Sequence, residues 1–99
     1  MESLRLPDIK PGPVRWKILD TEYGWTRFSF QVALTNAGYG PFSKSATIRF
    51  IDRQGFEVDH EFKYPLMIGK KEVFVWTGTF SLKEPRASAV TKATVEIGY

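Results

Sequence analysis

The chain has 99 residues, of which 42% are hydrophobic, 15% aromatic and 25% charged, and this balance predicts one globular domain with little disorder. The absence of cysteine excludes disulfides, thiolate metal sites and cysteine nucleophiles, and the single histidine, His60, excludes chemistry that needs two imidazoles. The net charge of +3 comes from 14 basic and 11 acidic residues spread along the chain, whereas nucleic-acid binding favours a basic patch. We expect no signal peptide and no transmembrane segment, because no apolar run is long enough for either.

Residues 1–13 contain Pro7, Pro11 and Pro13, which lack a backbone donor and have a fixed φ. This composition predicts no regular element. We interpret the segment as a proline-rich lead-in or linker, with a disordered tail and an edge segment docked on the domain as open alternatives. Residues 14–99 then form the single domain.

From residue 14 onward, apolar and polar residues alternate, which is typical of strands with one buried face. A first strand through Trp16 and Ile18 ends in a turn centred on Tyr23 and Gly24. The clearest alternation follows, in a strand whose predicted buried residues are Phe28, Phe30, Val32 and Leu34.

Turn residues at 36–41 precede a strand over 45–52, and residues 52–55 predict a tight hairpin turn. We expect Asp52 to accept backbone hydrogen bonds in this turn and Gly55 to adopt a positive φ. The partner strand then has two faces. One face is predicted to be apolar and contains Phe56, Val58, His60 and Phe62; the other is predicted to be wet and contains Glu57, Asp59, Glu61 and Lys63.

Tyr64 and Pro65 break the alternation, and residues 68–72 predict a second turn before a strand over 73–80. Residues 82–84 could form a short helical turn that Pro85 limits, and a final strand spans about residues 90–97. Six strands without a long amphipathic helix predict an all-β fold, an antiparallel β-sandwich of six to seven strands. A small closed barrel is the alternative.

Several short motifs follow one another along the chain. They are residues 30–36 ending in Asn36, residues 48–52 closing on Asp52, residues 54–58, the turn at 68–72 and the strand 73–80. Together they resemble the FxLyD-type immunoglobulin-like β-sandwich domain of bacterial proteins, over about residues 14–97. The resemblance implies an immunoglobulin-like sandwich. It also implies an add-on module of a cell-envelope or secreted protein, and it implies no reaction.

His60 is the only candidate imidazole, and Asp59 and Glu61 flank it. Because neighbouring residues of a strand point to opposite faces, we expect both carboxylates to point away from His60, which favours a core or edge histidine over a metal ligand. The acidic row of Glu57, Asp59 and Glu61 is interpreted as a solvated sheet face.

Other catalytic and ligand-binding motifs are absent from the sequence. No serine lies in a Gly-x-Ser-x-Gly or Ser-x-x-Lys motif. Gly38 and Gly40 precede a proline and a strand, so that the helix N-terminus of a phosphate site is missing. Asp52 lacks the further oxygen ligands of a calcium loop. We therefore predict no catalytic residue, no metal and no cofactor.

Aromatic side chains are the remaining signal. Five of them fall in or beside predicted turns: Tyr23, Trp25, Tyr39, Phe42 and Tyr64. Exposed rings can stack on sugars or contact a partner protein, although small sandwiches also use loop aromatics to close the ends of their core. Trp16 and Trp76 lie in predicted strands and are assigned to the core or to an edge.

Two functional hypotheses follow, and neither is an enzyme. The first is a noncatalytic immunoglobulin-like module that contacts proteins, or other domains of a longer parent chain, or acts as a spacer. The second is a carbohydrate-binding module that uses the loop aromatics. Nucleic acid is not expected as a partner, because basic and aromatic residues do not interleave on one strand. An extracytoplasmic or envelope location follows from the family resemblance only.

Overall fold

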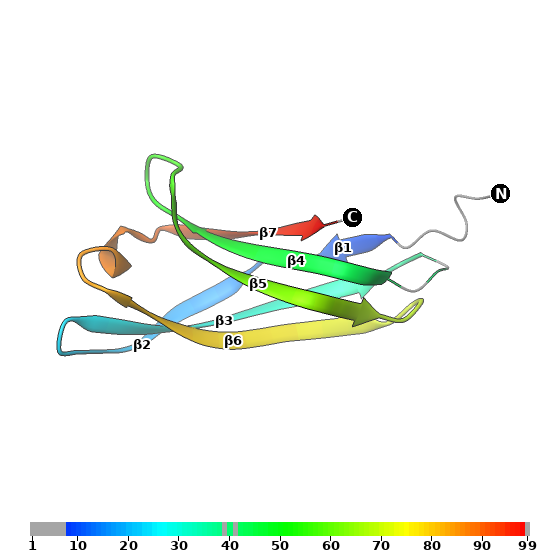
Figure 1. The fold of residues 1–99 in the computed structure, drawn as a ribbon, viewed down its shortest axis with the longest axis horizontal. Helices are drawn as coiled ribbons and strands as arrows, with labels where there is room; N and C mark the ends of the chain where they lie inside the picture. Colours follow the sequence, from blue (N-terminus) through cyan, green and yellow to red (C-terminus); the bar gives the residue numbers. More distant parts are fainter. Residues whose placement is uncertain (1–7, 39, 41, 99) are drawn as a thin grey trace.

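The computed structural model describes residues 8–38, 40 and 42–98, and over these residues the chain is an antiparallel β-sandwich (Figure 1). The elements are β1 (Ile9–Pro11), β2 (Arg15–Glu22), β3 (Trp25–Asn36), β4 (Phe42–Ile51), β5 (Glu57–Ile68), β6 (Val73–Lys83), the 3-10 helix η2 (Ala87–Ala89) and β7 (Lys92–Gly98). The seven strands confirm the predicted all-β sandwich. Within the described part of the chain, no helix is long and apolar enough to cross a membrane.

The strands form two sheets with an immunoglobulin-like order. In the four-stranded sheet, β3 lies between β6 on one side and β1 and β2 on the other, and in the three-stranded sheet β4 lies between β5 and β7. In the immunoglobulin fold, strand B lies between A and E, and strand C pairs with F. Here β3 lies between β2 and β6, and β4 pairs with β7, so the pairing follows the same plan. β5 lies beside β4 in the place of strand C′.

The strand β1 lies in the proline-rich segment where the sequence predicts no regular element. Ile9 pairs with Asn36 and Pro11 with Leu34 along the edge of β3, and Ile9 is buried in the core. The amide of Gly12 donates to the carbonyl of Ala33 at 2.8 Å, and β2 then continues along the same edge. Pro11 is tolerated because an edge strand needs hydrogen bonds on one side only.

Two tight turns confirm the sequence prediction. Tyr23 and Gly24 have φ values of 53° and 79°, and two consecutive positive values are typical of the type I′ turn that joins twisted strands. In the β4–β5 turn, the Asp52 carboxylate accepts from the amides of Gln54 and Phe56, each at 2.9 Å. Gly55 has a φ of 92°, as expected.

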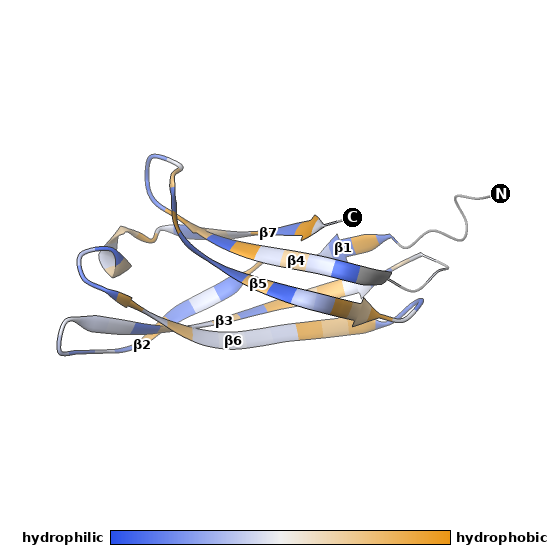
Figure 2. Ribbon diagram, in the orientation of Figure 1, coloured by the Kyte–Doolittle hydropathy of each residue, from blue (hydrophilic) through white to orange (hydrophobic). Residues whose placement is uncertain are grey.

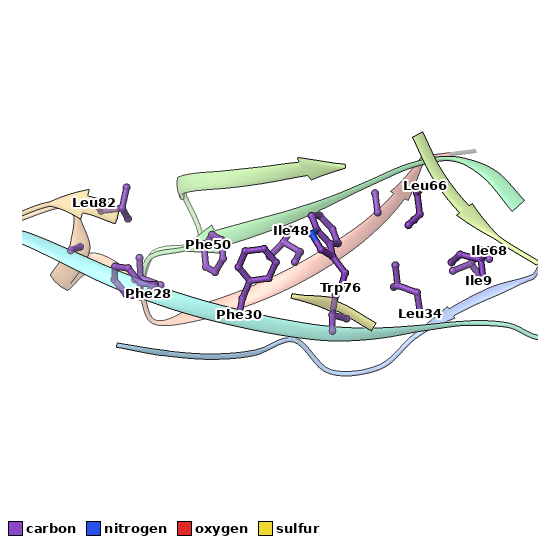
Figure 3. Close-up of a cluster of buried hydrophobic side chains, with 14 residues drawn as sticks. Ile9, Phe28, Phe30, Leu34, Ile48, Phe50, Leu66, Ile68, Trp76 and Leu82 are labelled. Carbon is purple, nitrogen blue, oxygen red and sulfur yellow. The ribbon is translucent and has the colours of Figure 1, made fainter. Parts of the chain in front are cut away.

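The core is a single row of side chains between the sheets (Figure 3). The predicted face of β3 forms one side of it, since Phe28, Phe30, Val32 and Leu34 are all at most 5% exposed. Phe80 stacks on Phe28 at 4.9 Å between ring centroids and lies 4.3 Å from Phe50 of the opposite sheet. Where the sheets diverge, beside η2 in Figure 1, the buried residues Ala87 and Val90 fill the space. Trp76 is buried and Trp16 half-buried, as predicted.

The predicted faces of β5 are wrong between residues 59 and 63. The prediction is also wrong for Phe56, which precedes the strand and is 71% exposed. A bulge places Glu57 opposite Ile51 but Asp59 opposite Phe50, so one residue of β5 has no partner on β4. Asp59, Glu61 and Lys63 therefore share the inward face with Phe50, Ile48 and Ala46, whereas His60 and Phe62 point outward and are exposed. The bulge inverts the alternation, because two residues on one strand occupy the space of one on its partner.

The inward charges of β5 lie at the side of the sandwich, since β5 is an edge strand. Lys63 extends to the other sheet, where its ammonium lies 5.5 Å from the centre of the Phe74 ring. Figure 2 shows that β5 changes from mainly hydrophilic residues in its first half to hydrophobic ones at its C-terminal end. Inward-pointing charges on an edge strand hinder pairing with a further strand, because pairing would bury them more deeply.

Glu61 is the residue on this edge whose substitution should stabilise the protein. Burial, and then the charge of Asp59, raise the pKa of Glu61. A raised pKa means that the folded state disfavours the ionised form, so Glu61 lowers stability above its folded pKa and has no such effect below its unfolded pKa. We expect Glu61→Gln to raise the free energy of unfolding at neutral pH by less than about 1 kcal/mol, because solvent screens a half-buried group.

The check is thermal unfolding of Glu61→Gln and the wild type at pH 7 and at about pH 3, below the usual range of glutamate. The gain should vanish at the acidic pH. Glu22→Gln, on the exposed face of β2, serves as the control. A stabilisation of Glu61→Gln that is equal at both pH values would contradict the assignment.

Three further boundaries differ from the prediction. β5 continues through Pro65 to Ile68, with a second register shift opposite residues 44–46, because an edge strand accommodates proline. β6 continues to Lys83, so residues 82–83 are strand and the short helical element is Ala87–Ala89. The last strand is Lys92–Gly98, after Val90 has packed into the core.

Asn36 binds four backbone groups at the end of β3. Its amide donates to the carbonyls of Gly40 at 2.9 Å and Ile68 at 3.1 Å. Its carbonyl oxygen accepts from the amides of Gly38 at 3.0 Å and Asp8 at 3.2 Å. The side chain is fully buried, so it joins the two sheets and the N-terminal segment where no regular hydrogen-bond ladder does so.

Candidate functional site

The five aromatic residues singled out in the sequence do not converge on one site. Tyr23 lies in the β2–β3 turn, Trp25 begins β3, and Tyr64 lies inside β5 on the other sheet. Tyr39 lies outside the described residues. Phe42 begins β4, and its side chain is not among those described. Tyr23, Trp25 and Tyr64 are 92%, 50% and 71% exposed, so they do not close the ends of the core.

Tyr23 and Trp25 line an open hollow of about 380 Å³ on the outer face of the four-stranded sheet. Its other lining residues are Asp20, Glu22, Arg27 and Ser81. The Arg27 guanidinium donates to the Asp20 carboxylate at 2.6 Å, across the β2–β3 pair. The hollow thus combines two aromatic rings with carboxylate, guanidinium and hydroxyl groups.

A second open hollow, of about 500 Å³, lies farther along the same face. The side chains on its outer side are Arg15, Lys17, Ser29, Gln31, Thr77 and Thr79. These residues occupy the outward positions of β2, β3 and β6, because the residues between them point into the core. Two cations and four uncharged polar groups line this hollow, and the lining is completed by Trp16, Phe30 and Gly78, which lie at the core-facing positions between them. Among the described residues, no carboxylate lines it.

An exposed apolar row runs along the outward face of β5. Phe62, Tyr64 and Met67 are 60%, 71% and 71% exposed. Phe62 lies opposite Thr47 of β4, which in turn lies opposite Glu96 of β7, so the row borders polar residues of the two neighbouring strands. We call Phe62, Tyr64 and Met67 the β5 row.

An ionic network lies beside the β5 row on the same outer face. Arg49 pairs with Glu57 at 2.5 Å and with Glu96 at 2.9 Å, and His60 Nδ1 lies 3.2 Å from Glu57. The hydrogen bond from Arg49, and then that from His60, lower the pKa of Glu57. These hydrogen bonds favour the ionised carboxylate, which is the electrostatics of a structural ion pair.

Glu84 is a second carboxylate with structural partners. Its side chain accepts hydrogen bonds from Ser88 and from Thr26, the latter at 2.8 Å. The bond from Ser88, and then that from Thr26, lower the pKa of Glu84. Glu84 thus fastens the segment around η2 to β3.

His60 lies on the exposed outer face, away from the inward Asp59 and Glu61 that flank it in sequence. The prediction that these carboxylates point away from the imidazole is therefore right, although its assignment of the buried face is reversed. The carboxylate that contacts His60 is Glu57, which lies near it because of the bulge. Among the described residues, no group of three or more histidine, cysteine or acidic side chains is placed to hold a metal ion.

Sequence reasoning missed Phe62 because it placed this residue on the buried face of β5. It also missed Arg27 and Gln31, although the alternation of β3 already puts both on the same face as Trp25. The alternation of β3 therefore already indicates which of its side chains line the hollows. The exposure of Phe62, by contrast, depends on a bulge that the alternation of β5 does not show.

No family model, no curated protein and no solved structure matches this chain. The fold and its surfaces define the class: a seven-stranded antiparallel β-sandwich with an exposed apolar row on one sheet and an aromatic and polar face on the other.

Proposed function

We propose that this chain is a noncatalytic immunoglobulin-like binding module that contacts a protein partner, or another domain of a longer parent chain, through the β5 row. The observation that carries the proposal is the exposure of Phe62, Tyr64 and Met67 side by side on one edge strand. Exposed apolar side chains that lie together, unlike scattered ones, mark interaction sites.

The composition around the β5 row suits a protein interface. Phenylalanine, tyrosine and methionine are enriched in interface cores, where arginine also occurs, and the surrounding rim is polar. Arg49 and Glu96 would supply such a rim, since they lie on the adjacent strands of the same outer face. The pairing of Arg49 with two carboxylates also limits the cost of covering it.

The noncatalytic assignment is supported by the chemistry of the titratable groups. Glu57 and Glu84 have lowered pKa values because they accept hydrogen bonds that hold neighbouring strands and loops. A general acid or base at neutral pH needs the opposite, a carboxyl whose pKa is raised toward neutrality in a cleft. The pKa of Glu61 is raised, but this residue faces inward beside Asp59 and does not lie in a cleft of the outer faces.

The bacterial and envelope setting of the proposal rests on the FxLyD resemblance.

Substitution of the β5 row should abolish partner contact and leave the fold intact. A photo-crosslinking residue at position 64 is expected to give a discrete protein adduct in cells, and Phe62→Ser should remove that adduct. Once the partner is identified, Phe62→Ser should weaken its affinity by tenfold or more, about 1.4 kcal/mol. The exposed side chain predicts a change in unfolding free energy within about 0.5 kcal/mol.

The matched control is a crosslinking residue at position 77, on the outer face of the opposite sheet, together with Val73→Ser, which also removes an exposed apolar side chain. The proposal fails if positions 64 and 77 give the same adducts, or if position 64 gives none.

A further inference from the structure

We propose that the outer face of β2, β3 and β6 is a binding groove for an anionic glycan chain. This groove lies on the opposite sheet from the β5 row and uses none of its residues, so it extends the molecule's role beyond the protein contact. The two hollows of about 380 and 500 Å³ are its two halves.

The groove follows β3. Trp25, Arg27 and Ser29 point outward in succession, followed by Gln31, and alternate residues of a strand are about 7 Å apart, so this row spans about 20 Å. β6 contributes a parallel row of hydroxyls, since Ser81 lies opposite Arg27, Thr79 opposite Ser29 and Thr77 opposite Gln31. A linear array of hydroxyl, amide and charged groups matches the hydroxyl-rich edge of an extended oligosaccharide, which needs a donor or acceptor at every unit.

The aromatic end of the groove provides the stacking surface. Trp25 is half-exposed and is held by the first residues of β3, which pair with both β2 and β6. Tyr23 lies in the adjacent turn, almost fully exposed. An amphipathic ring of this kind packs its apolar face on the C–H face of a sugar. Beside the rings, Asp20 and Arg27 present acceptor and donor groups for sugar hydroxyls, and they pair with each other at 2.6 Å.

The other end of the groove determines the charge of the ligand. Arg15 and Lys17 lie opposite Gln31 and Ser29, and both cations are exposed. Because no carboxylate lines this hollow, its field favours an anion. A glycan whose units carry carboxylate groups would place them here and its sugar faces on Trp25.

Other ligands fit less well. Single-stranded nucleic acid also stacks on aromatic rings, but successive bases need successive rings, whereas the outward-facing rings here, Tyr23 and Trp25, both lie at one end of the groove. A protein interface has an apolar centre, whereas Arg27 and Ser29 of β3, with Ser81 and Thr79 opposite them on β6, lie in the middle of this groove.

The test uses two hexasaccharide probes with the same sugar backbone, oligogalacturonate and its methyl ester, in which the carboxylate charge is removed. Calorimetric titration at low salt should show saturable binding of the acid form, and binding at least fivefold weaker for the ester. Trp25→Ala should weaken the acid form by tenfold or more. The double variant Arg15→Gln/Lys17→Gln should bind the two probes with equal affinity, and this affinity should be lower than that of the wild type for the acid form.

Phe62→Ser is the matched control, because it removes an exposed ring from the other sheet, and it should bind the probes like the wild type. If Trp25→Ala does not fold, the double variant still decides the test, since Arg15 and Lys17 are exposed. The proposal is overturned by undetectable binding at millimolar probe, by equal affinity for acid and ester, or by tighter binding of a single-stranded oligonucleotide. These outcomes leave the protein contact of the β5 row untouched, so the two proposals fail separately.

Discussion

Replacing Asn36 with alanine is expected to lower the free energy of unfolding by about 3 kcal/mol, because the fully buried side chain makes four hydrogen bonds to backbone groups. Without it, the carbonyls of Gly40 and Ile68 and the amide of Gly38 lose their side-chain partner. A buried polar group without a partner retains the full cost of leaving water, which exceeds the modest net gain of a typical hydrogen bond.

Asn36→Asp tests the same contact without a change in size. The substitution places a carboxylate oxygen against the two carbonyl oxygens that Asn36 now donates to, so we expect a loss at neutral pH at least as large as that of alanine. Urea unfolding measures both variants, and Thr35→Ala, at the adjacent outward position, is the control. A loss below about 1 kcal/mol for Asn36→Ala would show that water replaces the side chain at little cost.

Gly78→Ala is expected to destabilise the protein by about 2 kcal/mol through overpacking. A Cβ atom at Gly78 would lie 2.7 Å from Cζ of Phe30, its cross-strand neighbour. The Phe30 ring cannot move aside, because Trp76 packs edge-on at 5.5 Å and Phe50 lies at 6.1 Å between ring centroids. The absence of a side chain in the middle of β6 therefore allows Phe30 to fill the centre of the core.

A second substitution separates this steric effect from the strand propensity of glycine. Phe30→Leu shortens the side chain, so the double variant Gly78→Ala/Phe30→Leu should be more stable than the sum of the two single losses predicts, by more than about 0.5 kcal/mol. Gly12→Ala is the control, because its Cβ would lie at an ordinary 3.5 Å from the nearest atom. Strict additivity of Gly78→Ala and Phe30→Leu would refute the steric explanation.

The two proposed surfaces lie on opposite sheets, so both can be occupied at once. The β5 row belongs to the outer face of the three-stranded sheet, and the glycan groove to the outer face of the four-stranded sheet. The core row lies between the two sheets (Figure 3) and thus separates the two surfaces. The two proposals together therefore predict that a protein partner and a glycan bind at the same time.

Elements with a strong local signal are correctly predicted from the sequence. β3 has twelve residues of regular alternation, and its buried face agrees with the prediction. The turns at Tyr23 and Gly24 and at Asp52 also agree, because their chemistry is local: a positive φ at glycine, and a carboxylate that accepts from amides two and four residues ahead. The outward positions of β3, and with them half of the proposed groove, follow from the same alternation.

β5 shows what local pattern cannot predict. The alternation of residues 56–62 is as regular as that of β3, yet the bulge opposite Phe50 reverses which side chains face the core. The all-β sandwich, its turns and the buried face of its central strand can be predicted from the sequence, since these depend on periodicity and on residues close in the chain. The outward orientation of Phe62 and Tyr64 and the inward orientation of Asp59 and Glu61 depend instead on the long-range pairing of β5 with β4. The phase of an edge strand is set by its register with a neighbour, and a single extra residue in that register exchanges its two faces.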